Sequence, residues 1–207
     1  MPRLRAIFGP SDCGILSHRV MHDLRYLSTI LLMSFEKIHN VFIASTASVL
    51  GEVHLEPDVN IWYGASIRGD VAAIYIGNMT NVQDNVTIHC DHDVPNTIGN
   101  KVTLGHNAVC HGIEIGDGSL IGIHATLLGR TRVGKRCLIA AGAMLPPGLV
   151  VPDDHVVMGV PGKVVRQTTD NEKQYLLKLP PRYLQLVTKH YQTPEDATVK
   201  SWDGNMD

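Results

Sequence analysis

Aliphatic side chains recur at about every sixth position through most of the chain, with small and polar residues between them. The first runs place them at Ile43, Val49, Leu55, Ile61 and Ile67, at Ile76, Val82 and Ile88, and at Ile98, Leu104 and Cys110. A longer run continues through Ile115, Ile121, Leu127, Val133, Ile139, Leu145, Val151 and Val157. A period of six indicates a repeat architecture, because the alternating strands of a β-sandwich would give a period of two.

Each six-residue unit predicts a short strand and a turn, with the aliphatic side chain directed inwards. A glycine often follows this residue, and we expect it to ease a corner where the backbone takes an unusual φ. Three units close a triangular coil, and the coils stack in parallel register. The predicted fold class is therefore an all-β solenoid, a parallel β-helix over residues 34–168. Its resemblance to known hexapeptide-repeat proteins implies a left-handed winding.

The repeat is interrupted twice and stops before the C-terminus. Three extra residues between Ile67 and Ile76, and four between Ile88 and Ile98, predict loops that bulge from corners. Residues 169–192 predict a helical segment, in two short amphipathic pieces around a proline pair, packed along the solenoid. Residues 1–33 are expected to be disordered or foreign to the natural chain, with an ordered arm or a weak targeting sequence as alternatives, and residues 193–207 to form a loose tail.

Composition and charge narrow the class of protein. A chain of 207 residues, 44% of them hydrophobic, can form one domain with a continuous core. A formal net charge of −2 and an aromatic content of 5% argue against a nucleic-acid partner. The four cysteines form no CxxC pair, and neither a secretory signal nor an apolar run long enough to cross a bilayer is present. We therefore expect a cytoplasmic protein with no membrane association.

The register of the repeat brings chemically active residues together. When the two insertions are left out of the count, Arg68, His89 and His111 occupy the same position on successive coils. Adjacent strands lie about 4.8 Å apart, so two stacked imidazoles can both bind one zinc ion through bonds of about 2.1 Å. His106 belongs to the preceding unit and hence to a different face of the prism. It cannot easily join the same metal within one subunit.

A second chain that supplies His106 resolves this difficulty and places the metal in a groove between parallel subunits of a homotrimer. Three neutral imidazoles leave a fourth position for water, which is typical of catalytic zinc, although Fe²⁺ and Co²⁺ also suit imidazole ligands. The single histidines of the repeat, His54, His124 and His155, are expected to be surface residues. Cys110 holds an inward position and is expected in the core.

Several segments resemble the γ-class carbonic anhydrases. They are Ile67-Arg68-Gly69-Asp70, Asn81-Val82-Gln83-Asp84-Asn85, Thr87-Ile88-His89, and Leu104-Gly105-His106-Asn107-Ala108-Val109-Cys110-His111-Gly112. The resemblance covers about Ile38 to Arg166 and includes Gly159-Val160-Pro161-Gly162. It implies a homotrimer with metal sites at the interfaces, in which one subunit contributes His89 and His111 and its neighbour contributes His106.

The same resemblance implies roles for four further residues. Arg68 and Asp84 would form a salt bridge across subunits, Asp70 would support the interface, and Gln83 would hydrogen-bond the metal-bound water. Arginine suits a planar pair with a carboxylate. For Arg68 and Asp70, a role in assembly alone explains their presence at least as well as a catalytic role.

The implied reaction is the reversible hydration of carbon dioxide to bicarbonate by hydroxide formed on zinc. The chain departs from the family pattern in two places. Val71 stands where the family carries a glutamate after the Arg-x-Asp element, and the short loop Asp91-His92-Asp93 replaces a longer acidic loop with a proton-shuttling glutamate. Either His92 or a neighbouring aspartate replaces that shuttle, or the activity is weak or absent.

Two other classes of function stay open at this point. One is an acyltransferase that uses acetyl-CoA, with His89 or His111 as general base. The three histidines in ligand register, and the lack of a long loop to cover a coenzyme A arm, argue against it. The other is a non-catalytic metal-binding trimer.

Overall fold

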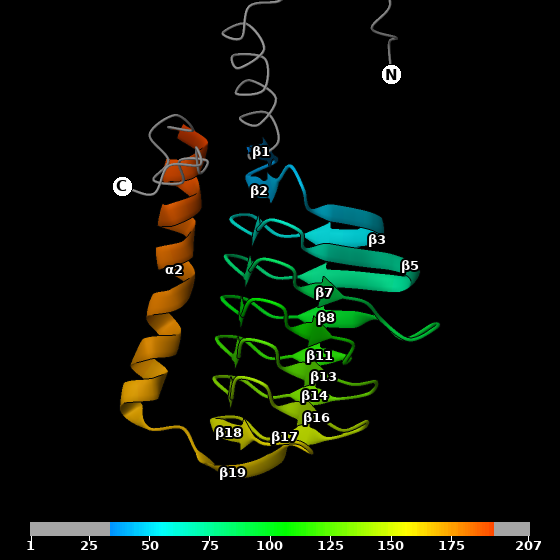
Figure 1. Cartoon of the computed structure of the whole chain (residues 1–207), viewed down its shortest axis with the longest axis vertical. Coiled ribbons are helices and arrows are strands. Elements are labelled where there is room, and N and C mark those ends of the chain that lie inside the picture. Colours follow the sequence, from blue (N-terminus) through cyan, green and yellow to red (C-terminus); the bar gives the residue numbers. More distant parts are fainter. Residues whose placement is uncertain (1–33, 193–207) are drawn as a thin grey trace, which may run out of the picture.

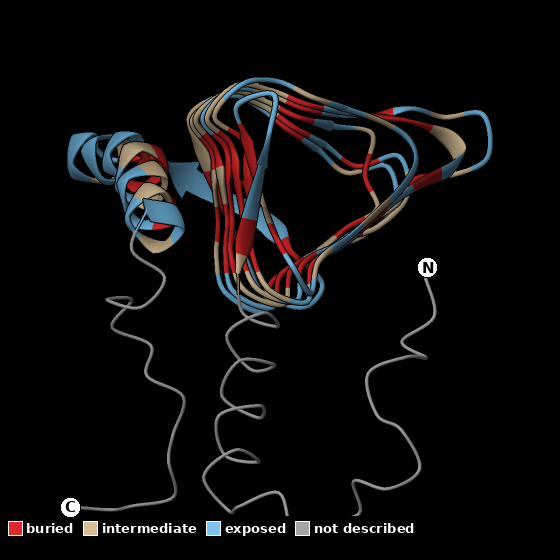
Figure 2. Ribbon diagram, turned by 90° about the horizontal axis from the view of Figure 1, so that it is seen from above, coloured by how far each residue is buried: buried red, intermediate tan, exposed pale blue. Residues whose placement is uncertain are grey.

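Residues 34–192 form a parallel β-helix of about six turns with one helix beside it (Figure 1). The computed structural model describes residues 34–192, so the expectations for residues 1–33 and 193–207 lie outside the described residues. The predicted fold class, a solenoid of hexapeptide repeats with a C-terminal helical segment, is confirmed. Seen along its axis, the solenoid is triangular, and buried positions line the inside of each face (Figure 2).

The first face is a nine-stranded sheet. Its inner strands are parallel, and an antiparallel pair closes each end. In sheet order the strands are β1 (Phe35–Ile38), β2 (Val41–Ala44), β4 (Asn60–Ile61), β6 (Asn81–Val82), β9 (Thr103–Leu104), β12 (Leu120–Ile121), β15 (Leu138–Ile139), β18 (His155–Met158) and β19 (Lys163–Gln167).

The second and third faces join into one ten-stranded sheet, because β3 (Ser48–Leu55) and β5 (Ser66–Ile76) run through the corner between them. The second face continues with β7 (Thr87–Ile88), β10 (Val109–Cys110), β13 (Thr126–Leu127) and β16 (Met144–Leu145). The third face continues with β8 (Asn96–Ile98), β11 (Glu114–Ile115), β14 (Arg132–Val133) and β17 (Val150–Val151).

Three columns of aliphatic side chains fill the prism, one from each face. The second column consists of Ile67, Ile88, Cys110, Leu127 and Leu145, and all five side chains are fully buried. The expectation that Cys110 is a core residue is met. The inward side chains of each coil pack against those of the coils before and after it. The register of the whole solenoid therefore follows from the six-residue period.

The glycines after the aliphatic residues allow close packing of coils, which corrects the expectation of an unusual φ at these positions. A Cβ atom on Gly105 would lie 2.8 Å from the backbone nitrogen of Ile123 on the next coil. The left-handed backbone occurs two positions further along, at Asn85 (φ 59°), Asn107 (φ 60°) and Gly142 (φ 68°). The chain changes direction at these later positions, which requires the positive φ. The glycine two positions earlier faces the neighbouring coil and is needed for its small size.

The two insertions differ in structure. Residues 91–95 form a loop between β7 and β8, as expected. The residues between Ile67 and Ile76 instead lengthen β5, so the expectation of a loop there is wrong. They remain extended because Gly51 to Leu55 of β3 pair with the widened corner.

The helix α2 (Asp170–Gln192) lies along the first face (Figure 2). It continues through Pro180 and Pro181 as one helix, which corrects the expectation of two separate pieces. Leu176, Leu179 and Pro180 are buried, and this packing offsets the backbone hydrogen bonds that the prolines remove. No helix within residues 34–192 is long and apolar enough to cross a membrane.

Candidate metal centre

Two of the predicted ligands stand on neighbouring coils of the second face. His89 follows β7 and His111 follows β10, and these strands pair in parallel with Ile88 opposite Cys110. The centroids of the two imidazole rings are 5.2 Å apart, and the ring planes meet at 43°. Arg68 occupies the same position one coil earlier, within β5. The six-residue count therefore predicts this vertical order correctly.

A carboxylate contacts each imidazole of this pair. Oδ1 of Asp70 lies 2.9 Å from Nε2 of His89, and Oδ1 of Asp91 lies 3.0 Å from Nε2 of His111. Arg68 donates a hydrogen bond to the second oxygen of Asp70. The contact with His89, together with that from Arg68, holds the pKa of the Asp70 carboxyl below its ordinary value. The side chains of His89 and His111 are 20% and 31% exposed, so a ligand can reach both from outside.

His106 lies on the first face, directly after β9. Its Nδ1 is 2.8 Å from Oδ2 of Asp84, which belongs to the coil before it. The amide of buried Gln83 accepts a hydrogen bond from the backbone nitrogen of His106 at 3.2 Å and donates one to Asn81 at 3.1 Å. Gln83 and Asp84 thus hold the backbone and the ring of His106.

The three histidines do not meet within one chain. In the described part of the chain, no group of three or more His, Cys, Asp or Glu side chains is close enough to hold a metal ion. Within the chain, Arg68 bonds to Asp70 and Asp84 to His106. The salt bridge between Arg68 and Asp84 across subunits stays a prediction.

The thiols next to the candidate ligands are protonated core groups. Burial raises the pKa of Cys110 to about 12. Burial also raises the pKa of Cys90, whose Sγ donates to the carbonyl oxygen of Ala72. Because a thiol binds zinc as the thiolate, neither cysteine suits a ligand role. His92 points away from the core with 79% exposure and contacts Asp93 at 2.7 Å between Nδ1 and Oδ2.

Two polar residues near the stacked histidines are not among the predicted site residues. Asp91 contacts the His111 ring, and Asn96 donates hydrogen bonds to the carbonyl oxygens of His89 and Cys110. Both stand at the ends of the insertion that follows His89, and that position is the signal that could have identified them.

Two family models match the solenoid. The bacterial transferase hexapeptide model (six repeats) matches residues 112–147, and the hexapeptide repeat of succinyl-transferase matches residues 95–123. Both models describe the repeat itself and agree with the coil structure.

Curated relatives and solved structures extend the likeness to most of the chain. A probable carbonic anhydrase of Methanocaldococcus jannaschii is 41% identical over 71% of this chain and 92% of its own length. Gamma carbonic anhydrase 2, mitochondrial, of Arabidopsis thaliana is 36% identical over 84% of this chain, which spans 66% of that relative's length. A hexapeptide transferase family protein from Anaplasma phagocytophilum superimposes with a TM-score of 0.70 at 31% identity, covering 75% of this chain and 92% of that one.

Proposed function

The chain belongs to the γ-carbonic anhydrase-like family of hexapeptide-repeat proteins, and on this premise we propose that it is a zinc-dependent enzyme that hydrates carbon dioxide reversibly to bicarbonate. The observation that carries this proposal is the stacked pair His89 and His111, with ring centroids 5.2 Å apart on adjacent coils. Imidazole nitrogens at such a separation can reach one zinc ion between them.

The donor set fits zinc. His89 and His111 are partly exposed, and Asp70 and Asp91 hold their rings by contacts at Nε2. Carboxylates that bond to histidines in this way are common around metal sites, because they fix the ring orientation. When bound, zinc acts as a Lewis acid and lowers the pKa of a coordinated water to about 7.

The third ligand comes from a neighbouring subunit of a homotrimer. His106 stands on the face adjoining the stacked pair and is 37% exposed, with Asp84 fixing its ring. Hexapeptide-repeat proteins are typically trimeric, and threefold symmetry gives three equivalent grooves. Each groove then contains His89 and His111 from one chain and His106 from the next.

Nearby side chains orient these ligands. Gln83 uses its oxygen to hold the backbone of His106 and one N–H to bond Asn81, so its second N–H can donate to an oxygen of the substrate. Arg68 keeps Asp70 against His89 within the chain. The resemblance also predicts that, in a trimer, Arg68 pairs with Asp84 of the adjacent subunit.

A second candidate function is acyl transfer from acetyl-CoA, which the likeness to a hexapeptide transferase family protein supports. A histidine general base would then be the active group, and zinc would be unnecessary. Measurements of zinc content and coenzyme binding therefore separate the two functions.

His106→Ala tests the shared site, and His124→Ala on the adjacent coil is its control. We expect about one zinc per subunit in the unaltered protein and in His124→Ala, and almost none in His106→Ala. Elemental analysis of the purified protein measures this, and stopped-flow hydration of carbon dioxide should fall in parallel. Full zinc content in His106→Ala would exclude the shared site, whereas acetyl-CoA binding without zinc would favour the transferase.

A further inference from the structure

Asn96 is a buried polar residue in an otherwise mostly aliphatic column. It begins β8, is 1% exposed, and lies opposite buried Ile74 on the preceding coil. The same position on the following coils carries Ile113, Thr131 and Leu149. An isoleucine at position 96 would fit this column and would bury no polar group. The presence of a buried side-chain amide therefore requires an explanation.

The Asn96 amide bridges the two coils that carry the stacked histidines. Its Nδ2 donates to the carbonyl oxygen of His89 at 3.0 Å and to that of Cys110 at 3.1 Å. Cys110 directly precedes His111, so one side chain ties the backbone at both candidate ligands. The oxygen of the same amide, Oδ1, is buried without a hydrogen-bond partner in the described structure.

The unpaired oxygen shows which contacts determine the orientation of this amide. Turning the amide over would place Oδ1 against two carbonyl oxygens and leave Nδ2 where Oδ1 now lies. Leaving the buried Oδ1 without a partner is unfavourable, but the two hydrogen bonds from Nδ2 to the carbonyl oxygens offset this cost.

The backbone at this point needs such a bridge because the insertion interrupts the regular coil. After His89 the chain leaves the strand for the loop of residues 91–95, whereas the preceding coil continues as the long strand β5. The His89 amide still donates to the Cys110 carbonyl at 3.2 Å. In residues 34–192, the donor that reaches the His89 carbonyl is the Asn96 side chain.

We propose that Asn96 is a positioning residue that sets the spacing of His89 and His111 for binding one metal ion. This inference rests on the proposed function, because the spacing of His89 and His111 matters only if both bind the same metal ion. Asn96 touches neither imidazole; it acts through the two carbonyl groups. Asn96, which directly follows the loop of residues 91–95, thus connects the end of that loop to the backbone of the two candidate ligands.

Asn96→Ala and the milder Asn96→Ser test the proposal, with Ser119→Ala as a matched control. Ser119 is also buried and bonds two backbone groups, the carbonyl of Gly134 and the amide of Cys137, at a different corner. We expect Asn96→Ala to raise the zinc dissociation constant about 10- to 100-fold, as loss of residues that orient metal ligands does. Asn96→Ser keeps one donor, so its zinc dissociation constant should lie between those of the unaltered protein and Asn96→Ala. The Co²⁺ absorption spectrum should change in both Asn96 variants, but not in Ser119→Ala.

A second readout needs no metal. Hydrogen exchange of the His89 amide in the metal-free protein should accelerate about tenfold in Asn96→Ala and stay unchanged in Ser119→Ala. If the unaltered chain binds no zinc, the proposed function fails and this exchange measurement alone decides whether Asn96 positions the backbone. Unchanged exchange at His89 would overturn the proposal, and so would equal losses of zinc affinity in Asn96→Ala and Ser119→Ala.

Discussion

Glycines in this solenoid have two distinct roles, and a pair of alanine substitutions separates them. A Cβ atom on Gly122 would lie 2.6 Å from the backbone oxygen of Ile139, whereas one on Gly142 would meet nothing within 4 Å. Gly142 instead has a φ of 68°, which other residues adopt at a cost. We expect Gly142→Ala to lower the free energy of unfolding by about 1 kcal/mol and Gly122→Ala by about 3 kcal/mol. Chemical denaturation measures both, and equal losses would contradict two roles.

The vertical order of the candidate ligands follows from the period, but their polar partners do not. Counting units places His89 between Arg68 and His111 in the stack, because strand register is fixed by the buried column. Asp91 lies in the insertion, where the period no longer assigns a residue to a face, and Asn96 begins the strand that follows it. Their contacts depend on how the loop closes, and a repeat count contains no such information.

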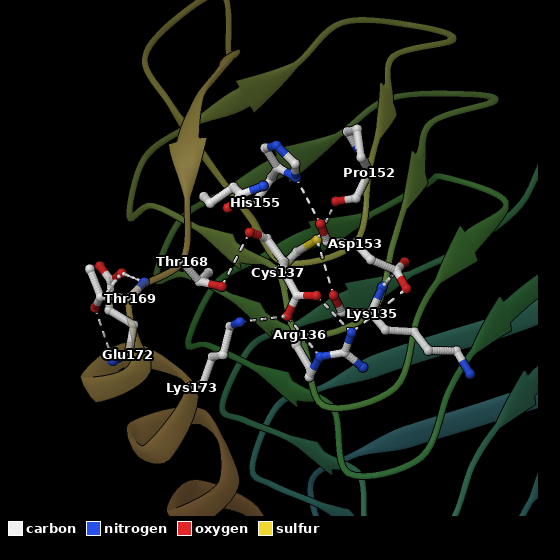
Figure 3. Close-up of polar contacts among 12 residues, drawn as sticks. Lys135, Arg136, Cys137, Pro152, Asp153, His155, Thr168, Thr169, Glu172 and Lys173 are labelled. Atoms are coloured by element: carbon white, nitrogen blue, oxygen red, sulfur yellow. Dashed lines mark hydrogen bonds and ion pairs between the residues drawn. The ribbon is translucent and has the colours of Figure 1, made fainter.

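The start of α2 carries a local sequence signal that is independent of the six-residue repeat. Thr169 and Glu172 bond each other reciprocally, since the Thr169 amide donates to Glu172 at 2.8 Å and the Glu172 amide donates to the threonine hydroxyl at 3.3 Å (Figure 3). This is a capping box, and its Thr-x-x-Glu spacing is visible in the sequence. The continuity of α2 through Pro180 was not predictable, because it depends on packing against the first face.

The junction between α2 and the solenoid should weaken in acid. Two hydrogen bonds of 2.8 Å from Arg166, followed by the Thr169 amide, lower the pKa of Glu172 to about 2. A lowered pKa stabilises the folded state above the ordinary carboxyl range, and this contribution is lost as the pH falls towards 2. Glu172→Gln should therefore lower the free energy of unfolding by about 1 kcal/mol at pH 7 and change little at pH 2.

Thermal unfolding followed by circular dichroism at several pH values measures this difference. Glu114→Gln is the control, because Glu114 also pairs with an arginine, Arg132, but lies on the solenoid away from α2 with half of its side chain exposed. We expect Glu114→Gln to lower the free energy of unfolding by less than Glu172→Gln does. A Glu172→Gln deficit that persists at pH 2 would show that side-chain charge is not its cause.

At the scale of the whole molecule, the helix and the stacked histidines lie on different faces of the prism. The helix α2 covers the first face at β1, β4, β6 and β9, whereas His89 and His111 belong to the second face. His106 follows β9 and is partly exposed beside Asp84. One chain thus carries the candidate ligands on two different faces, and a closed ring of identical subunits can bring such faces together.

Mixing the His89→Ala and His106→Ala variants tests that arrangement directly. With the proposed shared site, homotrimers of His89→Ala lack a ligand in every site, and so do homotrimers of His106→Ala. In a mixed trimer, a His106→Ala chain still supplies His89 and His111, and an adjacent His89→Ala chain supplies His106. Random assembly of equal amounts should therefore restore about one site in four, detected as zinc bound and carbon dioxide hydrated by the co-expressed chains. If one chain held all three ligands, no mixture of these variants would regain zinc, and the shared groove would be ruled out.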